Sequence, residues 1–531
     1  MLYRGPLDFP ESENGEYPRQ RLFVFLILIA AFLLRMFRLS GQSIWVDEML
    51  TLSSSGITTP LHLIDIFDNL HGPLHSIVIF LWSRLAGQSE FALRFPSVVF
   101  SILSMFVIYR LILRLTGSGT ALIALGLMAF SPFHVWYAQE ARNYSMFLFF
   151  AALSFQKFFD LLYEPDRKNF VLYLAVTLAA FLSNMSAAFV ALVQDVFFFF
   201  SHRKLSLRTL VMAHVFLALL LSPWLVGMFQ RIEFHRLART EPYAETEFLR
   251  GETTFSVFAL PYTFFVFSEG YSLGPSLSEL HGRAGLAAVS GYSSVLVPAA
   301  IGFSLALVLG IVSLRRRRAL LLLLGVWILI PLAVVSFFAV KNFKPFNPRY
   351  VMMCYPAYLI LVAEGLRPGR GALKGPMLKV SLIRFAASAL VLVTVLASLW
   401  NYYQAGKYGK DDFRSAAEIL SIEFAPGDVV FTEGTSEPLI YYVRHNREPI
   451  VPVPIYNYMI RNEDALAGFI TKKTQQASRV WLVTSRLWDI DPDGKVPALF
   501  RCTFIAEKSF HTRGVDLALF AARRAGPSEH F

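Results

Sequence analysis

The sequence predicts a polytopic α-helical membrane protein, with about eleven spans plus juxtamembrane helices, that carries a small external α/β domain. Of its 531 residues, 55% are hydrophobic and only 16% are charged, whereas about a quarter of the residues of soluble domains are charged. Apolar runs long enough to cross a membrane recur, such as "LFVFLILIAAFLLRMFRL" (22–39) and "SLIRFAASALVLVTVLASLW" (381–400). Near residue 405 the composition changes to short, alternating segments of strand and helix type.

Basic clusters orient the predicted spans. Short loops rich in Lys and Arg stay in the cytoplasm, so we expect 19–21, 201–208, 315–318 and 367–375 to be cytoplasmic. The net charge of +11 is therefore attributed to topology and not to nucleic-acid binding. This predicts a multi-pass protein of the plasma (inner) membrane with a cytoplasmic N-terminus and an external, periplasmic C-terminal domain. The first apolar run has no A-x-A-like cleavage site and is expected to be an uncleaved helix.

The predicted layout has three parts. A cytoplasmic tail (1–20) precedes a transmembrane domain (21–404) with external loops at 40–94 and 230–290, and a soluble domain (405–531) follows. After the first helix, the predicted spans are 95–113, 120–138, 143–163, 169–183, 186–200, 207–229, 294–314, 319–340, 350–366 and 380–401. Segment 73–84 is too short for a span and would begin and end outside, so we expect a half-inserted or juxtamembrane helix there.

The last 125 or so residues alternate between helix and strand patterns. The strand candidates are "GDVVFTE", "PIVPVPI", "RVWLVTS" and "DLALFAA", and the helix candidates are "DDFRSAAEIL", "SEPLIYYVRH" and "EDALAGFITKKTQQA". The turn "TEGTSEP" has one glycine and does not make a phosphate-binding fingerprint. The two cysteines, Cys354 and Cys502, cannot form a disulfide framework.

Unusual polar residues gather in four external or interfacial stretches: Asp47 with Glu48, then 69–76, 139–145 and 341–350. Carboxylates near lipid are costly unless they face water, pair or function. Acids, histidines and arginines at one interface suit a substrate with a lipid tail and an anionic head. Planar guanidinium groups bind phosphate well, and an ionised carboxylate can accept a proton from a hydroxyl.

The residues alone leave alternatives open. The acid pair could be a solvated surface or a helix cap, and Arg142 could pair with Glu140 or anchor the chain at the interface. His71 could be structural, because Pro73 suits the first turn of a helix with Gly72 and His71 at its cap. The Gly-Pro between His71 and His75 argues against a metal pair on a regular helix.

Five motifs, in order, resemble those of membrane glycosyltransferases that use polyprenyl-phosphate sugars. They are "WVDEMLT", "HGPLHSIVIFLW", "SEFALRFPSVVFSIL", "SPFHVWYAQEARNYSMF" and "NPRYVMMCYPAYLIL", which together span roughly residues 20 to 366. The resemblance is to the protein O-mannosyltransferase and lipid A aminoarabinose transferase type, with the C-type glycosyltransferase architecture. Gly72 stands where that family usually has the first of two prolines.

The resemblance implies an enzyme of cell-envelope or lipopolysaccharide biogenesis. It would move a sugar from a polyprenyl-phosphate donor to a hydroxyl of a protein, lipid A or glycan on the external face, with inversion. Asp47 would be the catalytic carboxylate and Glu48 its partner. The remaining site candidates are Arg142, Arg349 and His71 for the donor phosphate, and Glu140, Tyr144, Lys341 and Tyr350 for the substrate pocket.

No cofactor is certain from the sequence, and a divalent ion with Glu48 as its ligand is left open. The expected partners are the lipid-linked donor, the acceptor and the bilayer. Two alternatives are a transporter or flippase of a lipid-linked anionic sugar, and a non-catalytic membrane assembly scaffold. A transporter would explain the interfacial arginines but not an acid pair in the first external loop, and the sequence shows no paired halves with matching helix breaks.

Overall fold

The computed structural model divides the chain into two compact units. Of the described residues, the larger unit holds those within 1–39, 63–231 and 253–408, and the smaller unit those within 40–62, 232–252 and 409–531. The acid-bearing segment after the first helix therefore groups with the C-terminal residues. The described residues are 18–57, 72–201, 203–238, 256–276, 279–280, 289–341, 346–368, 376–433, 436–444, 446, 449–460, 462–487, 491 and 493–521.

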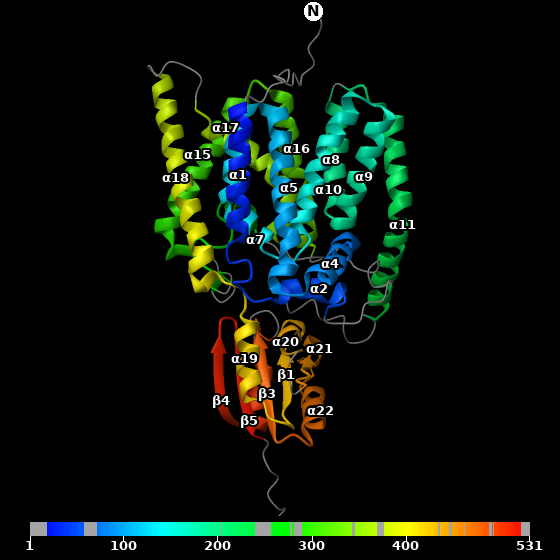
Figure 1. The fold of residues 1–531 in the computed structure, drawn as a ribbon, viewed down its shortest axis with the longest axis vertical. Helices are drawn as coiled ribbons and strands as arrows, with labels where there is room; N and C mark the ends of the chain where they lie inside the picture. Colours follow the sequence, from blue (N-terminus) through cyan, green and yellow to red (C-terminus); the bar gives the residue numbers. More distant parts are fainter. Residues whose placement is uncertain are drawn as a thin grey trace, which may run out of the picture. The chain divides into compact units, whose positions relative to one another are not determined.

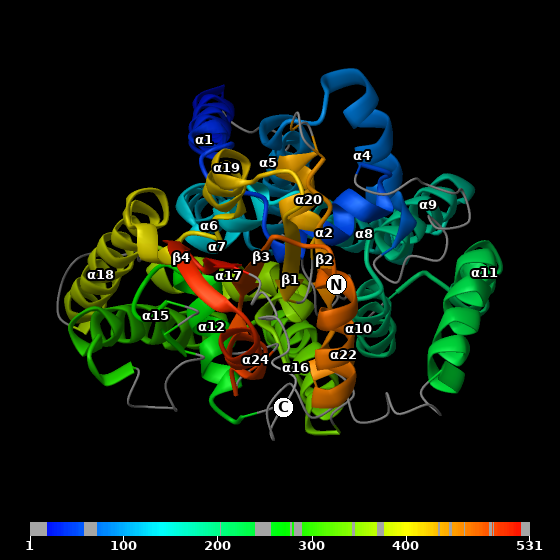
Figure 2. The ribbon, with the colours of Figure 1, turned by 90° about the horizontal axis from the view of Figure 1, so that it is seen from below.

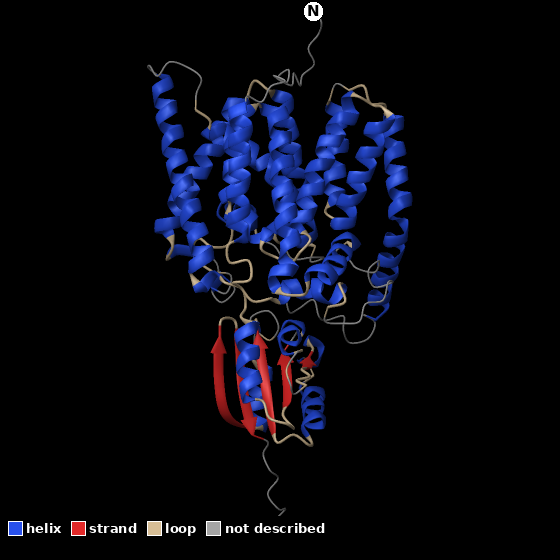
Figure 3. Cartoon of the chain, in the orientation of Figure 1, coloured by secondary structure: helices blue, strands red, loops and turns tan. Residues whose placement is uncertain are grey.

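The larger unit is built from helices (Figures 1 and 3). They are α1 (Pro18–Met36), α4 (Pro73–Ala86), α5 (Glu90–Thr116), α6 (Ser118–Phe130), α7 (Pro132–Ala138), α8 (Tyr144–Tyr163), α9 (Arg167–Ser183), α10 (Ala187–Phe200), α11 (Leu207–Ala238), α12 (Ala259–Glu269), α15 (Ser293–Leu314), α16 (Arg318–Val340), α17 (Tyr355–Leu366) and α18 (Pro376–Gln404), with 3₁₀ turns η2 (Pro348–Cys354) and η3 (Gly406–Tyr408). Seen from below in Figure 2, α15 lies beside α18 and α8 beside α9.

The prediction of a polytopic helical membrane protein is confirmed. Among the described helices, α5, α8, α11, α15, α16 and α18 are long and apolar enough to cross a membrane. The bent pair of α6 and α7, which changes direction by 59°, is long and apolar enough only when its two helices are taken together. The spans predicted from hydropathy fall on helices, except that 120–138 is divided between α6 and α7 and 350–366 between η2 and α17. The predicted short segment at 73–84 is the 14-residue α4. Helix α12, in the predicted external loop 230–290, was not predicted.

The bend between α6 and α7 follows from Ser131 and Pro132. Pro132 occupies the first turn of α7, where its missing N–H costs nothing, and Ser131 caps that helix by accepting a hydrogen bond from the His134 N–H. Every residue of α7 is buried. The bend thus brings a fully buried helix up to the "QEARN" segment, which begins at residue 139.

Arg35 of α1 links that helix to α5, α6 and α7 inside the larger unit. It is fully buried, and its guanidinium donates to the carbonyls of Ala31, Met128 and Ala129. It also donates to Ser101 Oγ at 2.8 Å and to His134 Nδ1 at 2.8 Å. A buried charge is tolerated when its donors are all used in this way, so Arg35 is a structural centre of the bundle.

Glycines allow α15 and α17 to pack with their backbones in contact. A Cβ added at Gly310 would lie 2.0 Å from the carbonyl oxygen of Leu361, and one at Gly365 would lie 1.8 Å from that of Ala306. Small residues at such crossings replace the hydrophobic driving force that lipid does not supply between helices. The turn η2, which contains Arg349, directly precedes α17 in the chain.

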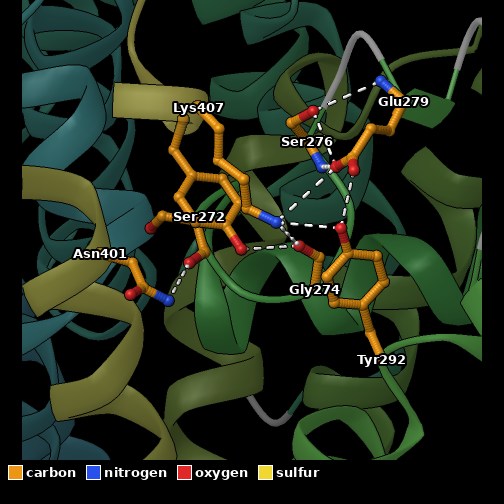
Figure 4. A network of polar contacts seen from close by, with 8 residues as sticks. Ser272, Gly274, Ser276, Glu279, Tyr292, Asn401 and Lys407 are labelled. Atoms are coloured by element: carbon orange, nitrogen blue, oxygen red, sulfur yellow. Dashed lines mark hydrogen bonds and ion pairs between the residues drawn. The ribbon is translucent and has the colours of Figure 1, made fainter. Parts of the chain in front are cut away.

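A polar network fixes the end of α18 and the segment after α12 (Figure 4). Lys407 Nζ lies 3.0 Å from the Tyr292 hydroxyl and 3.7 Å from Glu279 Oε2. Glu279 accepts hydrogen bonds from the Ser276 N–H and the Tyr292 hydroxyl, each at 2.7 Å. Asn401 of α18 donates to the Ser272 carbonyl at 3.0 Å. These contacts restrain the chain near the point where it leaves the larger unit.

The smaller unit contains the predicted α/β domain. Its five-stranded sheet has the order β2-β1-β3-β5-β4. Strand β1 (Val429–Glu433) pairs in parallel with β2 (Val453–Ile455) and β3 (Arg479–Ser485), and β5 (Val515–Ala521) runs antiparallel to β3 and β4 (Ile505–Thr512). The helices are α2 (Val46–Ser54), α19 (Phe413–Glu423), α20 (Glu437–Val443), α21 (Asn457–Ile460), α22 (Glu463–Thr474) and α24 (Lys495–Thr503).

The sheet has a hydrophobic core on each face, as the alternation of side chains in a strand requires. On one face, Val430 and Trp481 pack with residues of α19 and α20. On the other, Phe431 and Leu482 pack with residues of α22 and α24. Strand β4 and α24 were not predicted. Most of β4 is exposed and polar, as an edge strand that avoids aggregation should be, so it shows no apolar alternation.

Candidate functional site

The acid pair opens helix α2. Trp45 is the residue before the helix, and Asp47 and Glu48 lie in its first turn, where carboxylates interact favourably with the helix dipole. Asp47 is half-buried, while Glu48 is fully buried. A solvated surface pair, the alternative left open by the sequence, is therefore wrong for Glu48.

Glu48 has a buried cationic partner. Lys410 Nζ lies 3.7 Å from Glu48 Oε2, and the two side chains are 1% and 0% exposed. The same ammonium lies 5.4 Å from the centre of the Trp45 ring, within the range of a cation–π interaction. The pair was not predicted, because nothing in the sequence near Lys410 marks it as a partner of Glu48.

The segment that leads into α2 is held by residues of the α/β domain. Arg414 donates from its backbone N–H to Ser43 Oγ at 3.2 Å and from its guanidinium to the Ser40 carbonyl at 2.7 Å. The Tyr442 hydroxyl accepts the Ile44 N–H at 2.8 Å. Val46 packs against the core formed by α19, α20 and the sheet. The acid pair is thus fixed within the smaller unit by hydrogen bonds and by apolar packing.

Asp411 adds a second carboxyl group to this region. Burial raises the pKa of Asp411 to about 6, and the charge of Asp47 raises it as well, whereas Arg486 and Arg513 lower it. The effect of Asp47 indicates that the two carboxyl groups are neighbours. The protonation of Asp411 near neutral pH is therefore sensitive to the charge of Asp47.

A second group of candidates lies in the larger unit, on the buried segment 139–143 between α7 and α8. Gln139 donates to the carbonyls of Arg35 and Phe37, and Asn143 donates to the Ser183 carbonyl at 2.6 Å. The carbonyl of Arg142 accepts from Ser97 Oγ. Connecting segments usually lie on the surface, so this one is unusual in being buried and held at three points.

Two predicted arginines meet at one tyrosine. The guanidinium carbons of Arg142 and Arg349 each lie 5.8 Å from the ring centre of Tyr144. Arg349 lies in η2, and its backbone N–H donates to the side chain of Asn347, the residue that caps this turn. Its guanidinium carbon also lies 5.6 Å from the centre of the Tyr350 ring. Arg142 is 5% exposed and its Nε has no hydrogen-bond partner in the described part of the chain. Guanidinium groups bind anions such as phosphate through charge-assisted hydrogen bonds.

Tyrosine hydroxyl groups and Glu140 complete this group. The hydroxyls of Tyr137 and Tyr271 lie 2.9 Å apart. The charge of Arg349 lowers the pKa of Tyr271 and that of Glu140 raises it. Burial raises the pKa of Tyr271 well above its usual range, so this hydroxyl remains protonated and able to donate. Tyr271 and Tyr137 were not predicted, since tyrosines in an aromatic-rich chain resemble packing residues.

The other candidates differ in their surroundings. His71 lies outside the described residues, and Lys341 is exposed at the end of α16. His75, which was not selected, is buried, and burial together with the charge of Arg142 lowers the pKa of His75 to about 3. Its imidazole is therefore neutral. Among the described residues, no group of three or more His, Cys, Asp or Glu could hold a metal ion.

Gly72 is the N-cap residue of α4. Its backbone conformation explains why a glycine stands here in place of the proline that is usual in the family. Its φ is +90°, which proline cannot adopt. A Cβ there would also lie 2.5 Å from the Leu182 carbonyl oxygen. In this chain the segment therefore packs against the end of α9 in a way that only glycine permits.

These features define a polytopic membrane protein of the C-type glycosyltransferase fold with an α/β domain. Residues 70–226 match a family described as dolichyl-phosphate-mannose-protein mannosyltransferase. An uncharacterized protein of Aquifex aeolicus is 26% identical over 393 residues, which cover 72% of this chain and 70% of that protein.

Two solved structures share the fold. ArnT from Cupriavidus metallidurans, bound to undecaprenyl phosphate, superposes with a TM-score of 0.54 and 14% identity over 97% of this chain and all of the other. The oligosaccharyltransferase AglB from Archaeoglobus fulgidus, in complex with an inhibitory peptide and a dolichol-phosphate, superposes with a TM-score of 0.50 and 12% identity over 96% of this chain and 75% of the other. The resemblance expected from the five motifs is confirmed at the level of the fold.

Proposed function

We propose that this protein is an integral-membrane glycosyltransferase that moves a sugar from a polyprenyl phosphate to an acceptor hydroxyl. The observation that carries the proposal is that Arg142, on the buried segment 139–143, and Arg349, in η2, both lie near the Tyr144 ring. A pair of guanidinium groups beside membrane helices suits a phosphate whose lipid tail lies in the bilayer. The match of 70–226 to the mannosyltransferase family supports the same donor class.

In the proposed reaction, Asp47 accepts the proton of the acceptor hydroxyl. The hydroxyl oxygen forms a bond to the anomeric carbon while the bond from that carbon to the phosphate oxygen breaks, and the lipid phosphate leaves with the bonding electrons. One displacement inverts the anomeric carbon. Arg142 and Arg349 stabilise the charge that develops on the departing phosphate, because preformed donors cost no reorganisation during the step.

The proposal includes the setting of the reaction. The acceptor is a hydroxyl of a protein, lipid A or glycan, and the reaction takes place on the external face of the plasma (inner) membrane. The basic flank at 367–375 supports an external C-terminal domain, since it precedes α18. A reporter that is active only in the cytoplasm, fused after residue 531, should stay inactive; an active fusion would contradict the orientation.

The variant Asp47→Asn tests the chemistry. The amide has nearly the same shape but cannot accept a proton, and loss of a general base typically costs 10²–10⁴-fold in rate. Mass spectrometry of lipid and protein glycoconjugates from cells with wild type, Asp47→Asn or no protein gives the sugar mass and the acceptor together. Asp516→Asn, an exposed aspartate of the same unit, is the matched control and should behave as wild type.

Retention of more than about a tenth of wild-type product in Asp47→Asn would exclude Asp47 as the base. Full function of that variant would instead favour the transporter or scaffold alternatives. A divalent ion is tested separately with a chelator, which inactivates the wild type only if the reaction requires the ion. Binding of undecaprenyl phosphate should survive Asp47→Asn, since the arginines are unchanged.

A further inference from the structure

Lys410 is a buried lysine in the short segment that connects η3 to α19. Lysines are rarely fully buried, because the ammonium loses its hydration, and they are tolerated there only with a partner. The partner here is Glu48, at 3.7 Å, and the Trp45 ring covers the same ammonium. Both partners belong to the segment that carries the proposed base, Asp47.

The backbone of Lys410 also makes two hydrogen bonds, one to the segment before α2 and one to the turn between β4 and β5. Its N–H donates to Gln42 Oε1 at 3.1 Å, just before α2, and its carbonyl accepts from Arg513 Nε at 2.8 Å, in the turn between β4 and β5. Lys410 therefore links the sheet of the α/β domain to the start of the acid-bearing helix. These two bonds hold the backbone from which the Lys410 side chain reaches Glu48.

A fixed Glu48 determines where Asp47 points. Successive side chains of an α-helix diverge by about 100° around the axis, so holding Glu48 toward Lys410 turns Asp47 in a different direction. Asp47 is half-buried where Glu48 is fully buried. Asp47, Arg486 and Arg513 all act electrostatically on Asp411, the residue after Lys410.

We infer that Lys410 is a positioning residue of the acid site, which pairs with Glu48 so that Asp47 alone is presented for proton transfer. The α/β domain is then an integral part of the acid site and not an appended module. The inference rests on the proposed role of Asp47. Lys410 itself is not assigned a contact with donor or acceptor.

The test is a double-mutant cycle in the full-length protein with Lys410→Met, Glu48→Gln and both changes together. Removing one member of a buried pair leaves an uncompensated charge, whereas removing both does not. We expect Lys410→Met to lower the midpoint of thermal unfolding by several degrees, roughly 5–10 °C, and the double variant to recover at least half of that loss. Lys410→Arg keeps the charge and should stay within a few degrees of wild type.

Lys508→Met is the matched control. Lys508 also pairs with a glutamate of the smaller unit, at 2.6 Å from Glu423, but its side chain is 52% exposed, and exposed pairs contribute little. It should leave both the unfolding midpoint and the product yield unchanged. If Lys410→Met behaves as Lys508→Met does, the pairing role is overturned.

Activity separates positioning from stability alone. In cells grown well below the unfolding midpoint, Lys410→Met should lower the glycoconjugate yield at least tenfold, while binding of undecaprenyl phosphate by the purified protein stays within threefold. Additive effects in the cycle, or a wild-type yield from Lys410→Met, would overturn the inference. If wild type itself makes no glycoconjugate, the proposed function fails, and the unfolding cycle still decides whether Lys410 and Glu48 act as a pair.

Discussion

Two buried arginines of the larger unit, Arg35 and Arg142, are used in opposite ways. Arg35 is fully buried and donates five hydrogen bonds to carbonyls, a serine and a histidine. Arg142 is 5% exposed, and its Nε has no partner within the described part of the chain. Its surroundings are aromatic, with the Tyr144 ring at 5.8 Å.

The difference separates a structural charge from one that awaits a ligand. A buried guanidinium whose donors are all used has no capacity left for a substrate. A buried donor without a partner in the described part of the chain, such as Arg142 Nε, is costly until an anion binds it. Protein stability should therefore depend on Arg35 and ligand affinity on Arg142. Variants at the two positions test this distinction.

The largest effect is expected at Arg35. Arg35→Met removes five donors and leaves three backbone carbonyls and His134 without them, and each buried unsatisfied group costs about 1–3 kcal/mol. We expect little folded protein, measured by monodisperse yield from detergent. Arg110→Met, at an exposed arginine of α5, is the control and should give normal yield. A normal yield from Arg35→Met would show that the network is dispensable.

Arg142 should show the reverse pattern. Arg142→Met is expected to leave the yield and unfolding midpoint unchanged or slightly improved, because it removes a buried charge without a hydrogen-bond partner at Nε. Arg142→Lys should lower affinity for undecaprenyl phosphate or turnover by about thirtyfold, roughly 2 kcal/mol, since one ammonium cannot replace a two-donor fork. Near-normal values for Arg142→Lys would move the phosphate role to Arg349.

Much of the fold follows from local sequence, because a bilayer requires about 20 consecutive apolar residues for each spanning helix. The strands β1, β3 and β5 were predictable for a similar reason, since their residues are apolar or alternate. Strand β4 was not, because an exposed edge strand has no such pattern. Arg35 was not predicted either: within an apolar run, it resembles one more basic residue near the end of a helix.

In the candidate site, too, the residues marked by local motifs were predictable and those that depend on distant contacts were not. Arg142 and Arg349 were predicted because motifs close to them in sequence carry the pattern, and the structure brings them to the same ring. Lys410 and Asp411 could not be predicted, since their roles depend on a contact between residues far apart in the chain. A distant ion pair leaves no periodicity and no motif at either end.

A third prediction concerns Asp411, whose pKa is raised by burial more than it is lowered by the nearby arginines. Burial raises the pKa of Asp411 from 3.8 to about 6, so the folded state binds this proton more tightly than the unfolded state does. Its contribution to stability is therefore complete below about pH 4 and is lost as the pH rises through 6. The loss should be roughly 1–2 kcal/mol, allowing for partial exposure.

Asp411→Asn should remove that part of the pH dependence, measured as unfolding midpoints of the smaller unit between pH 4 and pH 7. Asp516→Asn again serves as the control, because Asp516 is 54% exposed. An unchanged pH profile in Asp411→Asn would mean that its proton is bound equally in both states. The variant also removes a negative neighbour of Asp47, so the pH profile of transfer should shift toward lower pH.

The smallest effect is expected at Glu279, in the network of Figure 4. The Ser276 N–H, the Tyr292 hydroxyl and the Lys407 charge lower the pKa of Glu279 to about 2. Its contribution is thus present above about pH 4.5 and is lost as the pH falls toward 2. Because the Lys407 and Glu279 side chains are 42% and 34% exposed, solvent screens most of this interaction. Glu279→Gln should therefore lower the unfolding midpoint at pH 7 by no more than a degree or two. A larger loss would show that the network contributes more to stability than its exposed charges suggest.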